Sequence, residues 1–282
     1  MPIDQLTILA PGLLGGSVAL AARAKGSAKR IVIWARRPEV RQALLDAKLG
    51  DVIAESPEAA AAEAQLVVIA SPVDAIAALA RQVAGHLPHG AVLTDVGSVK
   101  SDIARDGHAA LRGRGHFVGA HPMAGSERTG WEHGSATLFE GRTCFVTPLP
   151  ETDPRAIKTV ADFWRSLGAK VVNVTPADHD RIVAHISHLP QVLASSLGAF
   201  LAAKDPAWRD YAGNGLRDTT RIAGSDPELW RTILQQNRTE ILASLQNFQG
   251  ELASFEQALA RQDWDAVTSV LARGKQFRDG FR

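Results

Sequence analysis

Residues 6–17 read LTILAPGLLGGS, and this stretch decides the fold. Leu6 to Ala10 is a short apolar run typical of a buried strand, and the proline and glycines behind it indicate a tight turn. The residues from Val18 to Ala24 are rich in alanine and leucine, which predicts a helix. A strand, a glycine turn and a helix in this order present backbone N–H groups at the start of the helix, where phosphate groups bind.

The turn fits the Gly-x-Gly-x-x-Gly pattern of dinucleotide-binding proteins at Gly12 and Gly15, and Leu13 and Leu14 lie between them. Ala10 stands where the pattern has its first glycine. We expect alanine to fit there with a negative φ, so that the site survives. A glycine-rich helix start without a ligand is the alternative at this point.

Strands and helices then alternate through the first half of the chain. Strands are predicted over 30–34, 65–70, 91–95, 144–147 and 170–173, with helices over 73–83, from Ser101 and over 154–167. Such β-α repeats predict a parallel, doubly wound sheet. The fold class is therefore an α/β Rossmann-type nucleotide-binding domain, which we place at residues 1–175.

The second strand ends at Trp34 and is followed by Arg36 and Arg37. In NAD-binding proteins this position usually holds a carboxylate that accepts a hydrogen bond from the ribose 2′-hydroxyl. Two guanidinium groups suit a 2′-phosphate instead, so the sequence favours NADP, with NAD as the alternative. The other interpretation is that both arginines begin a solvated helix. Ser71, at the start of the helix after the third strand, is assigned to the same cofactor site.

Residues 119–127 read GAHPMAGSE and follow an apolar run over 117–120. We expect His121 at the exit of that strand because Pro122 fixes φ and removes an N–H. The carboxyl ends of the strands are where α/β sheets bind ligands. His121 is thus a candidate functional residue, and Ser98, in the turn after strand 91–95, is expected at the same edge. A structurally satisfied histidine and a helix-capping serine are the alternatives.

From Thr175 onward only helices are predicted. Thr175 begins one that carries His185 and His188 one turn apart, and Pro190 should kink it. No third or fourth ligand follows at a recognisable spacing, so no metal is predicted. A helix opened by residues 225–228 is expected to end at Gly250, with two amphipathic helices after it. We expect an all-α dimerisation domain over 176–282, because its long apolar stripes suit a homodimer.

Composition narrows the function classes. The net charge of +1 over 282 residues gives no support for a nucleic-acid partner. Cys144 is the only cysteine, which excludes an intrachain disulfide and a cysteine-based metal cluster. We expect a cytoplasmic protein without a membrane partner, because we find neither a secretory signal nor an apolar run long enough to span a bilayer.

Several motifs in one order resemble a known family. They are residues 12–17 (GLLGGS), 95–100 (DVGSVK), 121–127 (HPMAGSE), 179–180 (HD) through 187–190 (SHLP), and 220–227 (TRIAGSDP) with Trp230. The chain resembles prephenate dehydrogenases, including their arogenate-using and dual-specificity (cyclohexadienyl) relatives. The resemblance implies a monofunctional enzyme of tyrosine biosynthesis. It would convert prephenate to 4-hydroxyphenylpyruvate by oxidative decarboxylation, with hydride transfer to NAD(P).

The resemblance also implies roles for side chains. His121 would accept the substrate hydroxyl proton and Ser98 would hydrogen-bond the same hydroxyl. Arg221 would bind a substrate carboxylate, a structural ion pair with Asp218 or Asp226 being the alternative. His188 would line the substrate site from the helical domain, and Glu127 would orient or gate that site. Gln191 stands where many prephenate-specific members have histidine, so arogenate remains an alternative substrate.

Two other functions compete. A β-hydroxyacid or imine-type dehydrogenase shares the expected architecture but uses a lysine on the helix after the sheet, where this chain has histidines. A non-enzymatic NADP sensor would need the glycine turn but not the titratable cluster spread over two domains.

Overall fold

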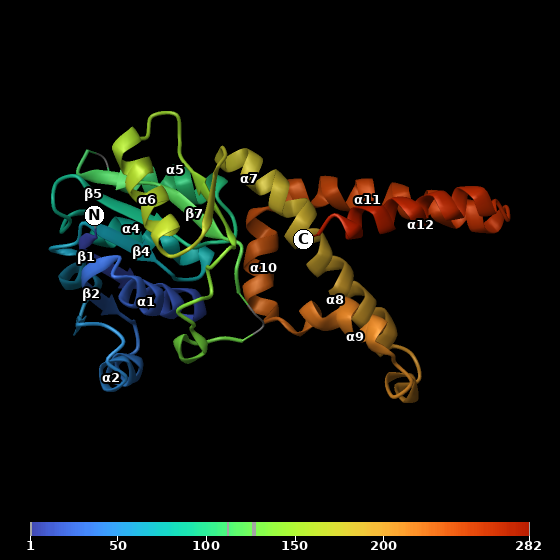
Figure 1. Ribbon diagram of the computed structural model, residues 1–282, viewed down its shortest axis with the longest axis horizontal. Helices are drawn as coiled ribbons and strands as arrows, with labels where there is room; N and C mark the ends of the chain where they lie inside the picture. The colour runs from blue at the N-terminus through green and yellow to red at the C-terminus, as the bar shows by residue number, and fades with distance from the viewer. Residues whose placement is uncertain (1, 112, 126–127, 282) are drawn as a thin grey trace.

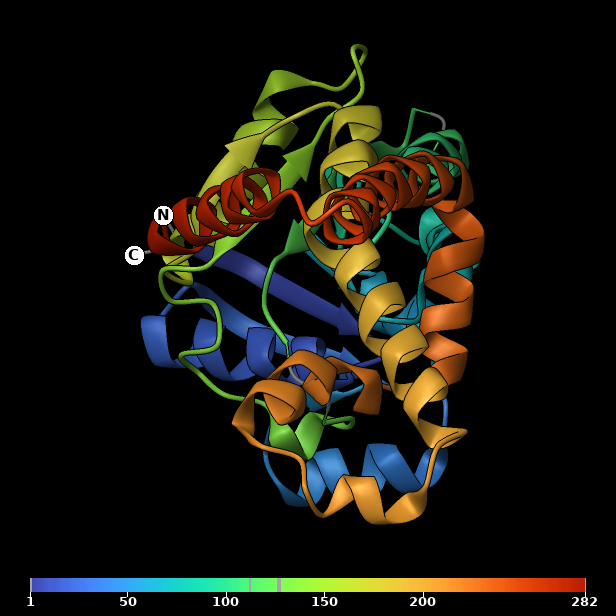
Figure 2. The ribbon, with the colours of Figure 1, turned by 90° about the vertical axis from the view of Figure 1, so that its right-hand side faces the viewer.

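The computed structural model describes residues 2–111, 113–125 and 128–281. Figure 1 shows an α/β part built from the first two thirds of the chain and a helical part that extends away from it. Figure 2, turned by 90°, looks onto the helical part. Within the described residues, none of the helices combines the length and the apolar character that crossing a bilayer requires.

A six-stranded parallel sheet forms the centre of the α/β part. Its strands are β1 (Ile3–Leu9), β2 (Ala28–Trp34), β3 (Val52–Ile53), β4 (Leu66–Ile69), β5 (Ala91–Asp95) and β6 (Gly115–Phe117). They lie in the order β3-β2-β1-β4-β5-β6. This is the order of dinucleotide-binding sheets, whose ligands lie where the order reverses, between β1 and β4. The predicted α/β Rossmann-type fold is confirmed.

Helices cover both faces of this sheet. They are α1 (Leu13–Lys25), α2 (Pro38–Asp46), α3 (Pro57–Ala61), α4 (Ile76–Ala84, after the 3₁₀ turn η1, Val73–Ala75), α5 (Ser101–Leu111) and α6 (Pro154–Ser166). Residues of α1, α2 and α6 pack in one apolar cluster, and residues of α3, α4 and α5 pack in a second. Burial on both faces explains why the strands are runs of apolar residues rather than alternating patterns.

A second sheet holds the candidate base. It has the order β7-β8-β9, from β7 (Gly119–Pro122), β8 (Thr143–Thr147) and β9 (Lys170–Asn173); the 3₁₀ turn η2 (Trp131–His133) lies between β7 and β8. The expected strand over 117–120 is thus divided between two sheets. His121 lies inside β7, opposite Phe145, and not at a strand exit as expected. Pro122 is tolerated in a strand because β7 is an edge strand of its sheet.

The helical part consists of α7 (Pro176–Val183), the π-helical segment η3 (Ala184–His188), α8 (Leu189–Ala202), η4 (Pro206–Arg209), α9 (Asn214–Thr220), η5 (Arg221–Gly224), α10 (Pro227–Gln236), α11 (Arg238–Ala260) and α12 (Trp264–Asp279). The helix is interrupted next to Pro190, as expected, by the π-helical turn that directly precedes α8. Figure 1 shows α11 and α12 side by side, projecting far from the sheets.

One expected helix boundary is wrong. Gly250 lies within α11, and the break comes earlier, at Asn237, where φ is −108° and ψ is 26°. A single glycine costs a long helix only about 1 kcal/mol relative to alanine. The side chain of Asn237, by contrast, is buried and hydrogen-bonds two groups outside its own helix.

Candidate active site

The start of α1 is shaped for a phosphate group. Gly12 is its N-cap residue, and a Cβ built there would meet nothing within 4 Å. Gly15 meets a different demand, because a Cβ there would lie 2.8 Å from Cβ of Ala70 at the end of β4. One glycine thus leaves open space before the first N–H groups of α1, and the other lets the helix pack closely on the sheet.

Ala10 corrects the expectation of a negative φ. Its φ is +57°, in the left-handed region that glycine adopts freely. Alanine pays about 1–2 kcal/mol for this conformation. Its N–H donates to the Trp34 carbonyl oxygen at 2.8 Å, which holds the end of β1 against the end of β2. The turn therefore keeps the glycine-type conformation despite the substitution.

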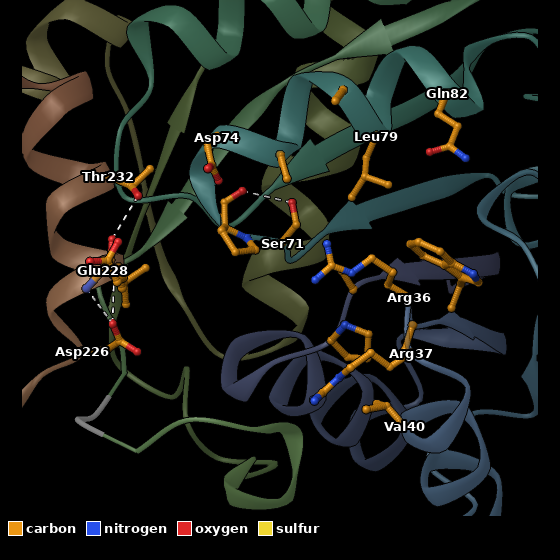
Figure 3. Close-up of a pocket in the computed structure, with 18 of the residues that line it drawn as sticks. Arg36, Arg37, Val40, Ser71, Asp74, Leu79, Gln82, Asp226, Glu228 and Thr232 are labelled. Carbon is orange, nitrogen blue, oxygen red and sulfur yellow. Dashed lines mark hydrogen bonds between the residues drawn. The ribbon is translucent and has the colours of Figure 1, made fainter.

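A cavity of about 760 Å³ lies beside this turn, between the α/β part and α10. Figure 3 shows Arg36, Arg37 and Ser71 on the sheet side and Asp226 and Glu228 on the side of α10. A cavity of this size beyond the strand ends of β1, β2 and β4, next to an open helix start, fits an NAD-type dinucleotide.

The two arginines differ in their contacts. Arg37 lies 3.7 Å from Glu39 in an ion pair whose side chains are 69% and 68% exposed. The structure gives Arg36 no ion pair within its described residues, and both arginines line the cavity. Ser71 is buried at 8% exposure, and its Oγ donates to the Pro72 carbonyl oxygen.

A chain of hydrogen bonds leads from His121 into the helical part. Nδ1 of His121 lies 2.9 Å from Nε2 of His179, and Nδ1 of His179 lies 2.8 Å from Oδ1 of Asp180. All three side chains are buried. The Asp180 carboxylate also accepts the backbone N–H groups of Lys100 and Ser101, each at 2.8 Å, so it joins α7 to the start of α5.

These contacts fix where the protons lie. Burial raises the pKa of Asp180, but hydrogen bonds from His179 and Ser101 outweigh burial and leave that pKa below its usual value. The carboxylate therefore accepts the Nδ1 proton of His179, whose Nε2 must accept from Nδ1 of His121. Burial, with charges of His179, Lys100 and His188, holds the pKa of His121 well below 6.5. His121 is thus a neutral ring with an unprotonated Nε2, the form that a general base requires.

A fully buried ion pair supports the strand that carries His121. Nζ of Lys100 donates to Asp95, and both side chains are 0% exposed. Asp95 also accepts the N–H of Gly97 at 2.8 Å and the N–H of Ala120 at 3.1 Å. The Asp95 carboxylate therefore ties β7 to the end of β5.

His188 lies close enough to Asp180 and His179 for their charges to act on its ring. It is 0% exposed, and burial lowers its pKa to about 4. Its ring stands perpendicular to that of Trp230, with centroids 5.8 Å apart. His185, one turn earlier, is exposed, and the described residues contain no cluster of three or more histidine, cysteine and carboxylate side chains suited to a metal ion.

The other predicted site residues are more dispersed. Ser98 is half-buried in the turn after β5. Gln191 is buried in α8, and its Nε2 donates to Ser195 Oγ at 3.2 Å. Arg221 is exposed at the start of η5. Glu127 lies outside the described residues.

Sequence reasoning missed the contacts of His179, Asp180, Lys100, Asp95 and Asn237 as site features. Part of the signal was present, since DVGSVK and His179-Asp180 both belong to the quoted motifs. Nothing in the spacing, however, indicates that Asp180 bonds a backbone 80 positions earlier.

Comparison with known proteins decides the family. The family model described as "Prephenate dehydrogenase, nucleotide-binding domain" matches residues 18–173. The model described as "Prephenate dehydrogenase, dimerization domain" matches residues 175–273. The chain belongs to the prephenate dehydrogenase family. It is a prephenate-type dehydrogenase with an NAD(P)-binding domain and a helical dimerisation domain.

Relatives agree with this assignment over the whole chain. The enzyme is 32% identical to a prephenate dehydrogenase of Bacillus subtilis, over 98% of this chain and 76% of the relative. It is 31% identical to a cyclohexadienyl dehydrogenase of Zymomonas mobilis, over 97% and 94%. A crystal structure of prephenate dehydrogenase from A. aeolicus, in complex with hydroxyphenyl propionate and NAD⁺, superimposes with a TM-score of 0.93 at 30% identity, covering 100% and 99% of the two chains.

The buried histidines predict that the enzyme loses stability in mild acid. The pKa values of His121, His179 and His188 are all lowered, chiefly by burial. Below pH 6.5 the unfolded chain binds protons that the folded chain does not, so the free energy of unfolding falls with pH. With a pKa of about 4, His188 alone should cost about 2 kcal/mol at pH 5.

Urea unfolding at pH 7.5 and pH 5 measures this effect above the range in which most carboxylates titrate. Replacing His188 by glutamine should reduce the difference between the two pH values. Equal stability of the unmodified enzyme at both pH values would contradict the prediction.

Proposed function

We propose that the enzyme catalyses oxidative decarboxylation of a cyclohexadienol, prephenate, to 4-hydroxyphenylpyruvate, with arogenate as the alternative substrate. The observation that carries this proposal is the hydrogen-bonded chain from Asp180 through His179 to His121. It leaves a neutral histidine with an unprotonated Nε2 in an enzyme whose candidate cofactor cavity lies at the ends of β1, β2 and β4.

His121 Nε2 accepts the proton from the hydroxyl group of the reacting ring carbon. A nicotinamide cofactor held in the cavity beside the start of α1 would supply the acceptor for the hydride that leaves that same carbon. The ring then loses its carboxylate as carbon dioxide, and the electron pair of the broken C–C bond completes the aromatic ring. His121 returns the proton to the phenolate oxygen. His179 and Asp180 keep the ring of His121 oriented throughout, and the desolvated surroundings keep it neutral before reaction.

Four side chains complete the proposed substrate site. Ser98 hydrogen-bonds the reacting hydroxyl, and Arg221 binds a substrate carboxylate. Glu127 orients or gates the site, and His188 lines it. We propose that Gln191 lies near the side chain of the substrate. Its neutral amide neither favours the pyruvyl group of prephenate by charge nor repels the ammonium group of arogenate.

We further propose that NADP is the preferred cofactor. Gly12, Leu13, Leu14 and Gly15 hold the pyrophosphate at the start of α1, and Ser71 lies on the opposite side of the strand-order reversal. Arg36 and Arg37 bind the 2′-phosphate. Two guanidinium groups in the cavity and no carboxylate directly after β2 support this choice over NAD.

Replacing Arg36 by aspartate together with Arg37 by asparagine should remove the preference. Charge-assisted hydrogen bonds contribute about 1.5–3 kcal/mol each, so kcat/KM for NADP should fall at least about tenfold. The value for NAD should change far less. Arg231→Asn is the matched control, because Arg231 lines the same cavity but pairs with Glu228 at 2.7 Å. An unchanged ratio of NADP to NAD in the double variant would exclude this role.

The decisive test of the function is reduction of NADP and of NAD by the purified enzyme, with prephenate and with arogenate in parallel. Turnover in any pair supports the reaction, and the ratios assign both substrate and cofactor. No turnover in all four pairs, with folded protein that binds NADP, would refute it and return attention to β-hydroxyacid or imine-type chemistry.

We also propose a homodimer formed through the helical part, residues 176–282. Large apolar side chains are exposed along its two last helices: Leu252, Leu259, Trp264, Leu271 and Phe277. Exposed apolar side chains in this number are typical of an interaction surface, and the family's description names this region a dimerisation domain.

A further inference from the structure

We propose that Asn237 is a positioning residue that fixes His188 as an Nε2–H donor toward a substrate oxygen. Asn237 lies at the junction of α10 and α11, where the helical geometry breaks, and its side chain is 4% exposed. The inference rests on the proposed function only for the identity of the acceptor, since the orientation of His188 follows from contacts within the chain.

The amide of Asn237 can lie in only one orientation. Its Nδ2 is 2.8 Å from the backbone carbonyl oxygen of Asp180. A carbonyl oxygen can only accept, so the amide nitrogen and not the amide oxygen must lie at this end. The same Nδ2 is 3.1 Å from Nδ1 of His188. Its second hydrogen therefore points at that ring nitrogen.

This contact selects the tautomer of His188. Nδ1 must accept a hydrogen from Asn237 and so carries none of its own. The single proton of the neutral ring then lies on Nε2. Burial and the charge of His179 keep the ring neutral against the opposing charge of Asp180, with a pKa of about 4.

The Nε2–H group is left to serve a ligand. Nε2 of His188 is buried and has no hydrogen-bond partner in the part of the chain that the structure describes. Buried donors are rarely left without an acceptor. His188 also lies close enough to His121 to lower the pKa of that residue. An oxygen of the substrate bound at His121 is the acceptor that this arrangement lacks.

Asn237 also connects His188 to the hydrogen-bonded chain of Asp180, His179 and His121. Through the Asp180 carbonyl it holds the residue whose carboxylate orients His179, and through His188 it holds the ring that faces the substrate. A sequence search would not select it, because it stands between the polar residues Gln236 and Arg238 and outside any motif.

The test is the tautomer of His188 in full-length enzyme labelled with ¹⁵N in its histidine rings, without substrate. The His188 signals are assigned by their loss in His188→Gln. We expect a protonated Nε2 and an unprotonated Nδ1. In Asn237→Asp a carboxylate would face Nδ1, so Nδ1 should become protonated and the pKa of His188 should rise. Gln235→Glu adds the same charge at an exposed site two residues away and should leave the spectrum unchanged.

Kinetics separate positioning from general damage. Asn237→Asp should raise KM for the substrate about tenfold, the effect of one lost hydrogen bond, and change kcat less. A wild-type His188 protonated on Nδ1 would overturn the inference, and so would an unchanged ring signal in Asn237→Asp. If that variant does not fold, the wild-type spectrum decides alone. If His188 has the expected tautomer but the enzyme turns over neither substrate, the proposed function is refuted. The orientation of His188 by Asn237 is then still supported.

Discussion

Replacing His121 by asparagine should lower turnover about 10²–10⁴-fold, the usual contribution of a general base. The asparagine amide can still donate to Nε2 of His179, at the position where His121 Nδ1 lies 2.9 Å away. It offers no basic nitrogen to the substrate hydroxyl. Affinity for NADP should stay the same, because the cofactor cavity is lined by other residues.

His185→Asn is the control for this variant. It makes the same substitution at an exposed histidine whose Nδ1 contacts the Arg181 carbonyl oxygen. Steady-state kinetics on both variants, with cofactor binding measured separately, isolate the proton transfer. Turnover of His121→Asn within a few-fold of the unmodified enzyme would exclude His121 as the base.

Replacing Lys100 by methionine should lower the free energy of unfolding by about 3–5 kcal/mol, the cost of removing one partner from a buried ion pair. Asp95 would keep the N–H groups of Gly97 and Ala120 but lose its only cationic partner within the described residues. The charge of Lys100 also lowers the pKa of His121. Its removal should therefore move the acid limb of the kcat/KM profile to higher pH.

Lys158→Met provides the comparison for stability. Lys158 pairs with Asp162 one helical turn away, where the side chains are 75% and 49% exposed. Exposed pairs contribute at most about 1 kcal/mol, so urea unfolding should barely change. If the two methionine variants lose equal stability, the buried pair does not hold β7 as we infer.

The sequence was sufficient for features that repeat locally along the chain. The glycine turn after β1 and the β-α alternation predicted a dinucleotide-binding sheet before its strand order was known. Thr175 was expected to begin a helix, and its Oγ1 accepts the N–H of Asp178 at 3.1 Å. The motifs and their order were enough to identify the family, because each motif is a short run of neighbouring residues and needs no knowledge of tertiary contacts.

Sequence reasoning failed where a tertiary contact outweighed the conformational preference of a single residue. Gly250 was expected to end a helix, but the break lies at Asn237, whose amide is used by groups 57 and 49 positions away. Ala10 was expected to avoid a positive φ, but the contact with β2 holds it there. In each case packing outweighed an intrinsic preference of about 1–2 kcal/mol.

The sequence by itself thus determined the main strands and helices, the domain order and the residue types available for chemistry. Only the tertiary structure decided which of those residues act together. His121 and His179 are 58 positions apart, and Asp180 meets the backbone of Lys100 across 80. Such pairs form because two sheets and a helix close around one buried volume, where unpaired charges and donors are too costly to remain. That requirement acts on the folded chain as a whole and leaves no periodic trace in the sequence.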